Sequence, residues 1–270
     1  MKVFLISFFS LVMCAIALLT TRLMGLNQAF PPFESAFMES FNNQKTPQLI
    51  MMLDPKSAQS YWTEASVQNL ATKNKGVILH SLVRKTTSGK LILCNCSQQQ
   101  INKNSEISTS AIDLSTALSI DTQQKFILDV ADNIENIHLE VFDILKKTKA
   151  ESRIILTSDT HAIIESLKEL LPLTVFGSSS ADRMRFQVFD ALFILPSVPF
   201  KGDIYWTSLK DKGVELINET IAIEMKRRHK QILLGPINSE ADLKKAMEYQ
   251  PFAVGTYNLN WLQENLSRLN

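Results

Sequence analysis

The stretch 231–263 constrains the fold more than any other part of the chain, because it alternates strand, helix, strand and helix patterns. Gln231–Leu234 and 252–254 are short apolar runs of the kind that form buried strands. Between them, Ser239 is suited to cap a short helix, which Pro251 ends. Two buried strands joined by one helix form a βαβ unit, and such a unit requires a parallel sheet.

The same alternation repeats along most of the chain. Short apolar runs begin at eight positions, and helical patterns separate nearly all of them. These runs begin at Leu49, Gly76, Phe126, Arg153, Leu173, Leu192, Gln231 and Phe252. Eight strands in this rhythm predict an α/β protein with a (β/α)8 TIM barrel, for which about 250 residues are needed. A doubly wound sheet is the alternative, but the glycine-rich first turn typical of that fold is missing at 53–56.

Three segments depart from the regular alternation. A turn at 88–89 followed by the apolar run Leu91–Leu93 predicts a short strand that returns beside the second strand. The polar segment 98–110 is typical of a surface loop. Residues 204–208 have the pattern of an extra strand beyond the eight.

The N-terminal end has a different composition. Residues 3–19 form an apolar segment without charge. Its length is near the lower limit for a membrane span and slightly long for a signal-peptide core. We interpret residues 1–23 as a signal anchor or signal peptide, residues 24–46 as a tether and residues 47–270 as the barrel. We favour an uncleaved anchor, with the barrel exported to a periplasmic, extracytoplasmic or lumenal compartment. A cleaved signal would instead give a secreted protein.

Charge and cysteine content exclude some partners and sites. A net charge of +1 gives no electrostatic reason to expect nucleic acid as a partner. Cys94 and Cys96 are two residues apart, which is awkward for an intrachain disulfide and does not match a metal-binding pattern. We therefore interpret them as small residues at a strand end.

In a barrel of this class the functional site lies at the carboxyl ends of the strands. Polar residues follow the predicted strands there: Asp54, His80, Arg84, Asn95, Asp129, Ser158, Asp159, Ser178, Asn238 and Tyr257. His80 and Asp129 are the candidates for catalysis, and Arg84, Asn95, Ser158 and Asn238 are the candidates for substrate binding. The remaining histidines are His138, His161 and His229, which fall on or beside helices and are interpreted as surface residues.

These residues are compatible with a metal site, a catalytic triad or a phosphate site. His80 and Asp129, with Asp54 and Asp159, offer donors for a divalent metal, although strand-end aspartates also cap helices. Ser158, His80 and Asp129 can be drawn as a triad, but no nucleophile-elbow glycines surround Ser158. Serines 178–180 suit either a phosphate site or a plain helix start, and we favour the helix start.

The motifs at the strand ends resemble those of one family. Gly235-Pro236-Ile237-Asn238 and Val254-Gly255-Thr256-Tyr257 stand in the places of a Trp-Thr-Val-Asn motif and a Gly-Ile-x-Thr-Asp strand. The segments 153–159 and 76–96 are similar to the fourth strand, and to the second strand with its return, of the same family. These are features of the glycerophosphodiester phosphodiesterases, metal-dependent (β/α)8 enzymes related to phosphatidylinositol-specific phospholipases. The resemblance covers 48–266.

The resemblance implies that most of the catalytic set has been replaced. The family's first-strand His-Arg-Gly falls on Met52, Leu53 and Asp54, and its second histidine with the adjacent aspartate falls on Asn95 and Cys96. Its metal-binding residues fall on His80, Leu82 and Asp129, the lysine near the last of these falls on Ala131, and the Trp and Asn of the seventh strand fall on Gly235 and Asn238. Asp129 is the one conservative replacement among the metal ligands, and Asn238 is retained.

The replacements lead us to expect a phosphodiesterase-like pseudoenzyme, inactive or very weakly active. The ligand expected from the resemblance is a phosphodiester, another phosphate ester or a lipid head group, which would link the protein to lipid metabolism. One alternative is an active metal-dependent phosphoric diester hydrolase with a rebuilt site, holding Mg²⁺ or Ca²⁺ through Asp129 and His80. The other alternative is a protein-interaction module.

Overall fold

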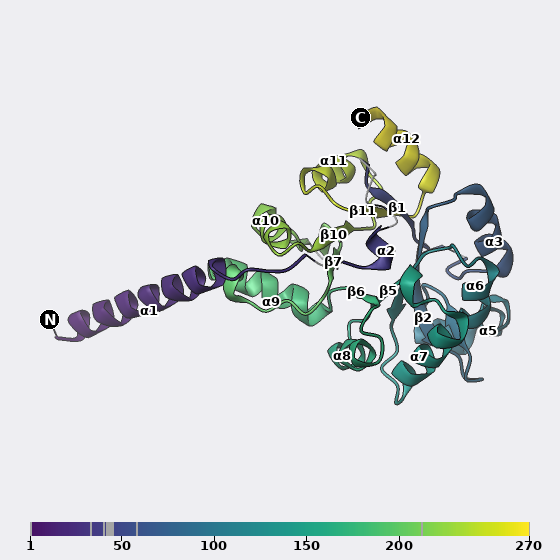
Figure 1. Ribbon diagram of the computed structural model, residues 1–270, viewed down its shortest axis with the longest axis horizontal. Helices are drawn as coiled ribbons and strands as arrows, with labels where there is room; N and C mark the ends of the chain where they lie inside the picture. The colour runs from purple at the N-terminus through teal and green to yellow at the C-terminus, as the bar shows by residue number, and fades with distance from the viewer. Residues whose placement is uncertain are drawn as a thin grey trace.

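Eight parallel strands form a sheet that curls into a nearly closed barrel (Figure 1). The computed structural model describes residues 2–32, 34–39, 41, 46–57, 59–211 and 213–269. Around the barrel, the strands are β6 (Val175–Phe176), β5 (Ile154–Thr157), β4 (Phe126–Val130), β2 (Ile78–Lys85), β1 (Gln48–Met51), β11 (Ala253–Thr256), β10 (Gln231–Leu234) and β7 (Ile204–Thr207). A parallel bridge between Gly177 and Ile204 joins the two end strands. The predicted (β/α)8 barrel is therefore confirmed, and the doubly wound alternative is wrong.

Helices surround the strands (Figure 1). They are α3 (Glu64–Lys73), α6 (Leu114–Ile120), α7 (Ile137–Thr148), α8 (His161–Leu170), α9 (Ser180–Ala191), α10 (Glu219–Arg227), α11 (Glu240–Glu248) and α12 (Leu259–Leu269). Ser239 caps α11 as predicted, since its hydroxyl accepts a hydrogen bond from the Asp242 N–H at 3.1 Å. The short strand β3 (Leu91–Leu93) pairs antiparallel with β2, which confirms the predicted return strand.

The apolar core has two layers because the barrel strands are buried on both faces. Outward residues of the strands pack against the helices, as Leu128 and Val130 of β4 do with Val141 of α7. Inward residues fill the barrel itself, including Ile78, Ile127 and Ile155. Burial of both faces explains why these strands are continuous apolar runs rather than alternating ones.

The N-terminal end of the barrel is covered by the segment that precedes β1. Phe37 and Met38 of α2 (Ala36–Glu39), together with Phe41, belong to the same buried cluster as the inward residues of the strands. The Lys125 ammonium group lies 3.6 Å from the centre of the Phe41 ring. Burial lowers the pKa of this lysine from 10.5 to about 8. Much of the predicted tether, 24–46, is thus packed on the barrel, while residues 33, 40 and 42–45 lie outside the described residues.

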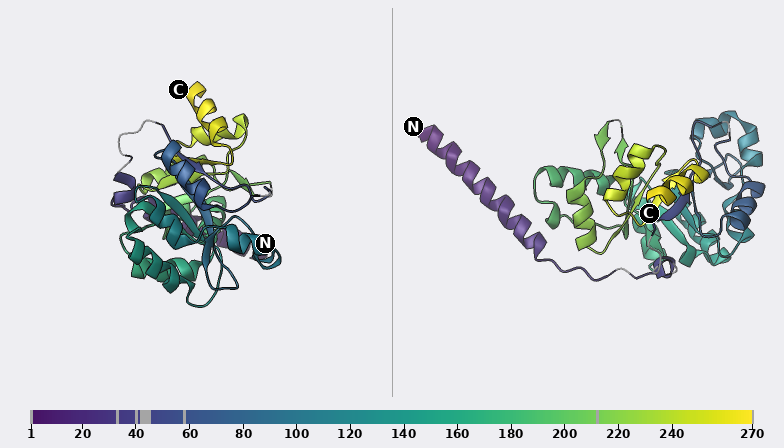
Figure 2. Two further views of the ribbon diagram at one scale, coloured as in Figure 1. Left: turned by 90° about the vertical axis from the view of Figure 1, so that its right-hand side faces the viewer. Right: turned by 90° about the horizontal axis from the view of Figure 1, so that it is seen from above.

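An apolar helix, α1 (Lys2–Leu26), extends away from the barrel, and the chain after it reaches the barrel again at α2 (Figure 2). Within it, Ser7–Leu26 is long and apolar enough to cross a membrane, by length and composition.

The sixth strand of the barrel is not the one predicted from the sequence. The apolar run 192–195 follows the end of α9 and leads into a 3-10 turn, Leu195–Ser197. Phe193, within this run, is exposed. The barrel strand is instead β7, whose four residues are all buried and pair with β10. Pro196 follows the run closely and lacks the N–H that a barrel strand donates, so it prevents strand pairing there.

The segment 98–110 is helical rather than a loop. It forms α4 (Gln98–Lys103) and α5 (Ser105–Ser110), capped by Ser97 and Asn104. Ile101 and Ile107 are buried and hold these two helices against the core. One apolar residue per short helix gives no period that could reveal the helices in the sequence. A small hairpin, β8 (Lys210–Asp211) and β9 (Val214–Glu215), was also missed.

Candidate functional site

The carboxyl ends of β2, β4 and β5 bring polar side chains together inside one end of the barrel. Asp129 is aligned with Leu82 of β2 and Thr157 of β5, and His80 is aligned with Ile127, one inward position deeper. The structure therefore brings His80, Asp129 and Thr157 to adjacent strands. Thr157 was not a sequence candidate. It is 2% exposed and its hydroxyl has no hydrogen-bond partner among the described residues.

His80 is buried in the barrel and stacks against Trp206. The centres of the two rings are 5.3 Å apart, and neither ring nitrogen of His80 has a hydrogen-bond partner within the described part of the chain. Burial lowers the pKa of His80 from 6.5 to about 4. The imidazole is therefore neutral at neutral pH, and Trp206 covers one side of it.

Asp129 carries a partly buried carboxyl group near the carboxyl end of β4. Its pKa rises from 3.8 to about 6, mainly because of burial and then because of the nearby Asp159 charge. The charges of Arg183 and Arg84 oppose this rise. No hydrogen bond to its carboxyl group is found among the described residues. A carboxyl group of this kind is half protonated near pH 6.

Two ion pairs lie beside Asp129. Arg84 pairs with Asp132 at 2.5 Å, and Asp132 also accepts a hydrogen bond from the Lys85 N–H at 2.7 Å. Arg183, on α9, pairs with Asp159 at 2.8 Å. The four paired charges cancel, so the net charge of the group is that of Asp129 itself. Arg183 was not a sequence candidate because it belongs to a helix rather than to a strand end.

The other predicted binding residues hold the loops in place. The Ser158 hydroxyl donates to the Val130 carbonyl oxygen at 2.7 Å and accepts from the Thr160 N–H. The Asn238 side-chain oxygen accepts hydrogen bonds from the Thr256 hydroxyl and the Tyr257 N–H, both at 3.0 Å. These two residues do not meet His80 and Asp129 through any described contact.

Asn95 lies between two cysteines that form a disulfide bond. The Cα atoms of Cys94 and Cys96 are 5.4 Å apart, within the range for a disulfide, because the chain turns sharply after β3. Our interpretation of them as unbonded small residues is therefore wrong. The Asn95 side-chain amide donates to the Leu53 carbonyl oxygen at 2.5 Å and ties the β1 loop to the β3 loop.

Close packing fills the barrel between β1, β10 and β11. A Cβ atom at Gly255 would lie 2.7 Å from the Met52 sulfur, and one at Gly235 would lie 2.9 Å from the Gly255 Cα atom. Larger residues at these glycines would force the strands or Met52 to move. Met52, which is buried, therefore acts as a packing residue of the barrel interior.

The donor set does not fit a divalent metal ion. No group of three or more His, Cys, Asp or Glu side chains within the described residues is arranged to hold one. Asp129 supplies a single carboxylate, and His80 is covered by Trp206, whereas Mg²⁺ and Ca²⁺ take about six or more oxygen ligands.

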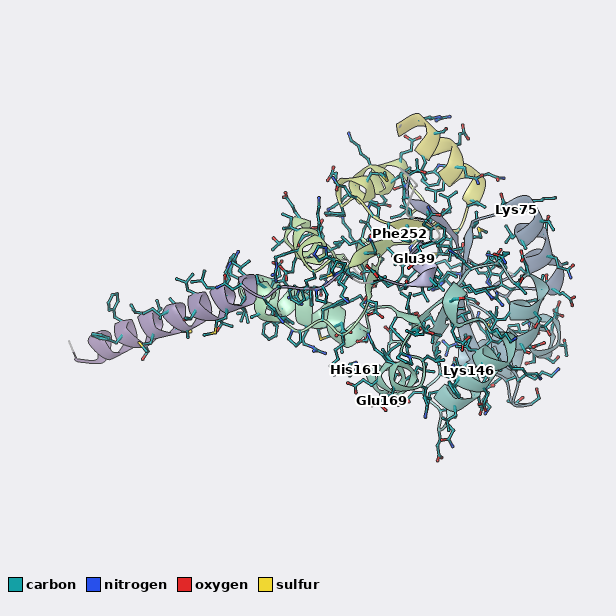
Figure 3. The ribbon with its side chains drawn as sticks, viewed as in Figure 1. Glu39, Lys75, Lys146, His161, Glu169 and Phe252 are labelled. Atoms are coloured by element: carbon teal, nitrogen blue, oxygen red, sulfur yellow. A yellow bond between two sulfur atoms is a disulfide. The ribbon has the colours of Figure 1, made fainter. Side chains whose placement is uncertain are left out.

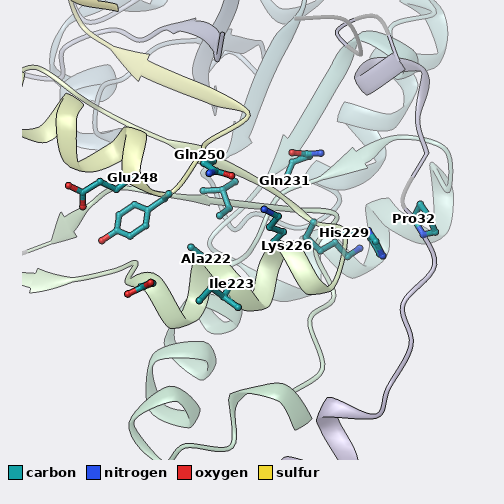
Figure 4. Close-up of a pocket in the computed structure, with 12 residues that line it drawn as sticks. Pro32, Ala222, Ile223, Lys226, His229, Gln231, Glu248 and Gln250 are labelled. Atoms are coloured by element: carbon teal, nitrogen blue, oxygen red, sulfur yellow. The ribbon is translucent and has the colours of Figure 1, made fainter. Parts of the chain in front are cut away.

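Features outside this end of the barrel are less suited to function. His161 begins α8 and lies 3.2 Å from Glu165, on the periphery of the molecule (Figure 3). A hollow of about 560 Å³ lies at the opposite end of the barrel, lined by residues that include Lys226, His229 and Gln250 (Figure 4). Functional sites of (β/α)8 barrels lie at the carboxyl ends of the strands, so the Asp129 end is the candidate site.

The fold is similar to that of several solved phosphodiesterase structures. An Oleispira antarctica phosphodiesterase in complex with the product sn-glycerol-3-phosphate has 15% identity and a TM-score of 0.61, with 87% of this chain and all of that chain covered. The glycerophosphoryl diester phosphodiesterase domain of a Mycobacterium tuberculosis protein has 12% identity and a TM-score of 0.59, with 83% of this chain and all of that domain covered. A Parabacteroides distasonis glycerophosphodiester phosphodiesterase has 10% identity and a TM-score of 0.58, with 83% and 98% covered.

At these identities the similarity concerns the fold alone. No protein-family model matches the chain. No curated protein matches it either. The resemblance inferred from the strand-end motifs is therefore confirmed as a similarity of structure.

Proposed function

We propose that this chain is a membrane-anchored, exported barrel that binds a phosphate ester and has lost efficient phosphodiester hydrolysis. The proposal rests on Met52 and Asn95, the two positions that correspond to the histidine pair of the glycerophosphodiester phosphodiesterases. Met52 packs on Gly255, and Asn95 holds the Leu53 carbonyl group. Neither side chain transfers protons at neutral pH, and a positioned general acid or base contributes about 10²–10⁴-fold to rate.

The ligand class is inferred from the fold and from the charges around Asp129. The similar Oleispira antarctica protein holds sn-glycerol-3-phosphate. In this chain, Arg84 and Arg183 supply two guanidinium groups beside Asp129, and guanidinium groups recognise phosphate well. With Asp129 protonated, the surrounding charges cancel, and its carboxylic acid becomes a hydrogen-bond donor for a phosphate oxygen.

The location is inferred from α1 and from the disulfide. Ser7–Leu26 is long enough to anchor the chain. Disulfides such as Cys94–Cys96 persist in oxidising compartments outside the cytoplasm. The helix supports attachment to a membrane and the disulfide supports export of the barrel; that α1 stays uncleaved is part of the proposal.

Binding and turnover have to be measured on the same protein. We expect calorimetric titration of the full chain in detergent with sn-glycerol-3-phosphate to give binding that strengthens as the pH falls from 7 to 5, because protonation of Asp129 removes a negative charge. We expect no release of glycerol phosphate from glycerophosphocholine with Mg²⁺, Ca²⁺, Mn²⁺ or Zn²⁺ present. Asp129→Asn, which keeps a donor and removes the charge, should bind more tightly than the native protein at pH 7, and only the second ionisation of the phosphate group, near pH 6, should then change its affinity between pH 7 and pH 5. Absence of binding at every pH would favour a protein-interaction module.

A second candidate function is weak hydrolysis by a rebuilt site. The observation that favours it is the Asp129 pKa of about 6, since perturbed carboxyl groups are common at active sites. Metal-dependent release of glycerol phosphate that disappears in Asp129→Ala, while the variant remains folded, would establish this function instead.

A further inference from the structure

The outward face of α9 is apolar, the reverse of what a helix on a soluble barrel presents to water. Every exposed residue from 181 to 193 is apolar, and we call this set the α9 face: Ala181, Met184, Val188, Ala191, Leu192 and Phe193. The largest of these side chains are 46% to 74% exposed, with Phe193 the most exposed. Nothing in the described part of the chain covers them.

The polar residues of α9 are turned sideways, toward neighbouring elements. Arg183 pairs with Asp159, and Arg185 lies 3.5 Å from Asp182 of its own helix. The Gln187 side-chain amide donates to the Glu215 carbonyl oxygen of β9, and Asp190 accepts from Asn218. The helix therefore satisfies its polar groups at its flanks and leaves a continuous apolar strip facing outward.

The C-terminal end of α1 is fixed to the end of this strip. The Arg22 guanidinium donates to the Phe193 carbonyl oxygen at 2.8 Å. Gly25 lies so close to the 3-10 turn Leu195–Ser197 that a Cβ atom there would overlap the Pro196 carbonyl carbon. Arg227 of α10 donates to the Gln28 carbonyl oxygen at 3.0 Å. Figure 1 shows the end of α1 beside the end of α9.

These contacts determine the height of Phe193 relative to a membrane that α1 crosses. The 20 residues of Ser7–Leu26 span about 30 Å as a helix, which matches the thickness of a hydrocarbon core. Arg22 lies about 6 Å and Gly25 about 1.5 Å from the end of this span at Leu26. Phe193, held by Arg22, must therefore lie at the boundary between acyl chains and head groups.

We propose that the α9 face lies in the head-group region of the same bilayer that α1 crosses. The proposal rests on the inference above that α1 is an uncleaved anchor. Apolar helix faces bury about 5–10 Å into this boundary region, which is enough for Leu192 and Phe193 and, along the helix, for Val188. A second copy of the chain is a less suitable occupant, because the face is continuous with α1 and ends at a residue that α1 holds at membrane height.

This arrangement brings the candidate site near lipid. α9 begins directly after β6, at the Asp129 end of the barrel, and Arg183 lies in its first two turns. The 12 residues of α9 are about 18 Å long, so the site lies within about that distance of the membrane surface. A phosphate-ester head group of the bilayer then becomes the accessible form of the ligand proposed above.

The test uses single labelled cysteines in the full chain with Cys14→Ser, reconstituted in vesicles of phosphatidylcholine and phosphatidylglycerol. Val188→Cys reports the α9 face, and Ile16→Cys reports α1. Leu139→Cys on α7 is the control, matched in exposure at 42% against 51% for Val188. Each label carries an environment-sensitive fluorophore, and the quenchers are lipids with a doxyl group either near the head group or near the end of the acyl chain. We expect the deep quencher to act at Ile16, which lies in the middle of the span, the shallow quencher to act at Val188, and neither to act above background at Leu139.

Each other outcome has a definite meaning. Quenching at Ile16 with Val188 no different from Leu139 would overturn the membrane contact of the α9 face and leave the anchor intact. Absence of quenching at Ile16 would overturn the anchor and, with it, this proposal. Crosslinking between two Val188→Cys copies, without quenching, would assign the face to a second copy. The double change Val188→Asp and Phe193→Asp, both at exposed positions, should remove the quenching of a label at Leu192→Cys without changing the thermal unfolding temperature by more than a few degrees.

Discussion

Replacing Asp129 by Asn should stabilise the protein at neutral pH. Asp129 is partly buried, lies near the Asp159 charge, and has no hydrogen bond to its carboxyl group among the described residues. Its ionised form is therefore penalised in the folded state. Asparagine has nearly the same shape and carries no charge, so the change removes the penalty without opening a cavity.

The size of the effect follows from the pKa. Folding raises the pKa of Asp129 from 3.8 to about 6, and a tenfold change in an acid constant is worth about 1.4 kcal/mol. The free energy of unfolding of the native protein should therefore fall by about 3 kcal/mol across the whole titration, of which about 2.4 kcal/mol falls between pH 4 and pH 7. The sign is fixed because the folded state binds this proton more tightly than the unfolded chain. Water that reaches the partly buried carboxyl group reduces the effect to about 2 kcal/mol.

The assay is urea unfolding of the full chain in detergent, followed by tryptophan fluorescence, at several values between pH 4.5 and 7.5. Asp129→Asn should be more stable than the native protein at pH 7.5, and the difference should shrink toward pH 4.5. Asp132→Asn is the matched control. Asp132 is paired with Arg84, so removing its charge should destabilise the protein. An Asp129→Asn variant that is less stable at pH 7.5, or that keeps the native pH slope, would refute the reasoning.

Three further predictions concern the scaffold. Glu224 is 4% exposed and pairs with Arg227 and the buried Arg228. Glu224→Ala should therefore lower the free energy of unfolding, measured in urea, by about 3–5 kcal/mol. Glu264 forms an exposed pair with Arg268, and an equal loss in Glu264→Ala would contradict this reasoning. Gly25→Leu should free the end of α1 from the barrel, because no Cβ atom fits against Pro196. Limited proteolysis at 27–32 should become faster, while the unfolding temperature of the barrel stays that of the native protein. An unchanged rate of proteolysis would count against the contact between α1 and the barrel. Replacing both Cys94 and Cys96 by Ala should cost about 1–2 kcal/mol, because the bond closes a very short loop, and a loss as large as 4 kcal/mol in the same unfolding assay would be inconsistent with that loop length.

Residue pattern was sufficient for the architecture but not for every strand. The βαβ unit at 231–263 required a parallel sheet, and seven of the eight predicted runs coincide with barrel strands. The run 192–195 was misassigned because apolar character alone does not distinguish a strand from a helix end. The pairing of Ile204–Thr207 with β10 is a long-range property that no local pattern contains.

The candidate site was predicted only in part, for a similar reason. His80 and Asp129 could be placed at strand ends because the strands were recognised. Thr157, Trp206 and Arg183 were missed, since their roles come from neighbours across the barrel or on a helix. The sequence also gave no sign that Ser158 and Asn238 would be used for loop hydrogen bonds, because the same residue types serve binding and structure equally well.

The sequence by itself determined the barrel, the apolar N-terminal helix and the residue types at the strand ends, Met52 and Asn95 among them, because these depend on local periodicity and residue type. Only the tertiary structure decided that Met52 packs on Gly255, that Cys94 bonds to Cys96, and that Arg22 fixes α1 to Phe193. Those facts depend on which segments the closed sheet brings together. The same closure buries His80 and leaves Asp129 with a raised pKa, so the chemistry of the site is a property of the assembled barrel.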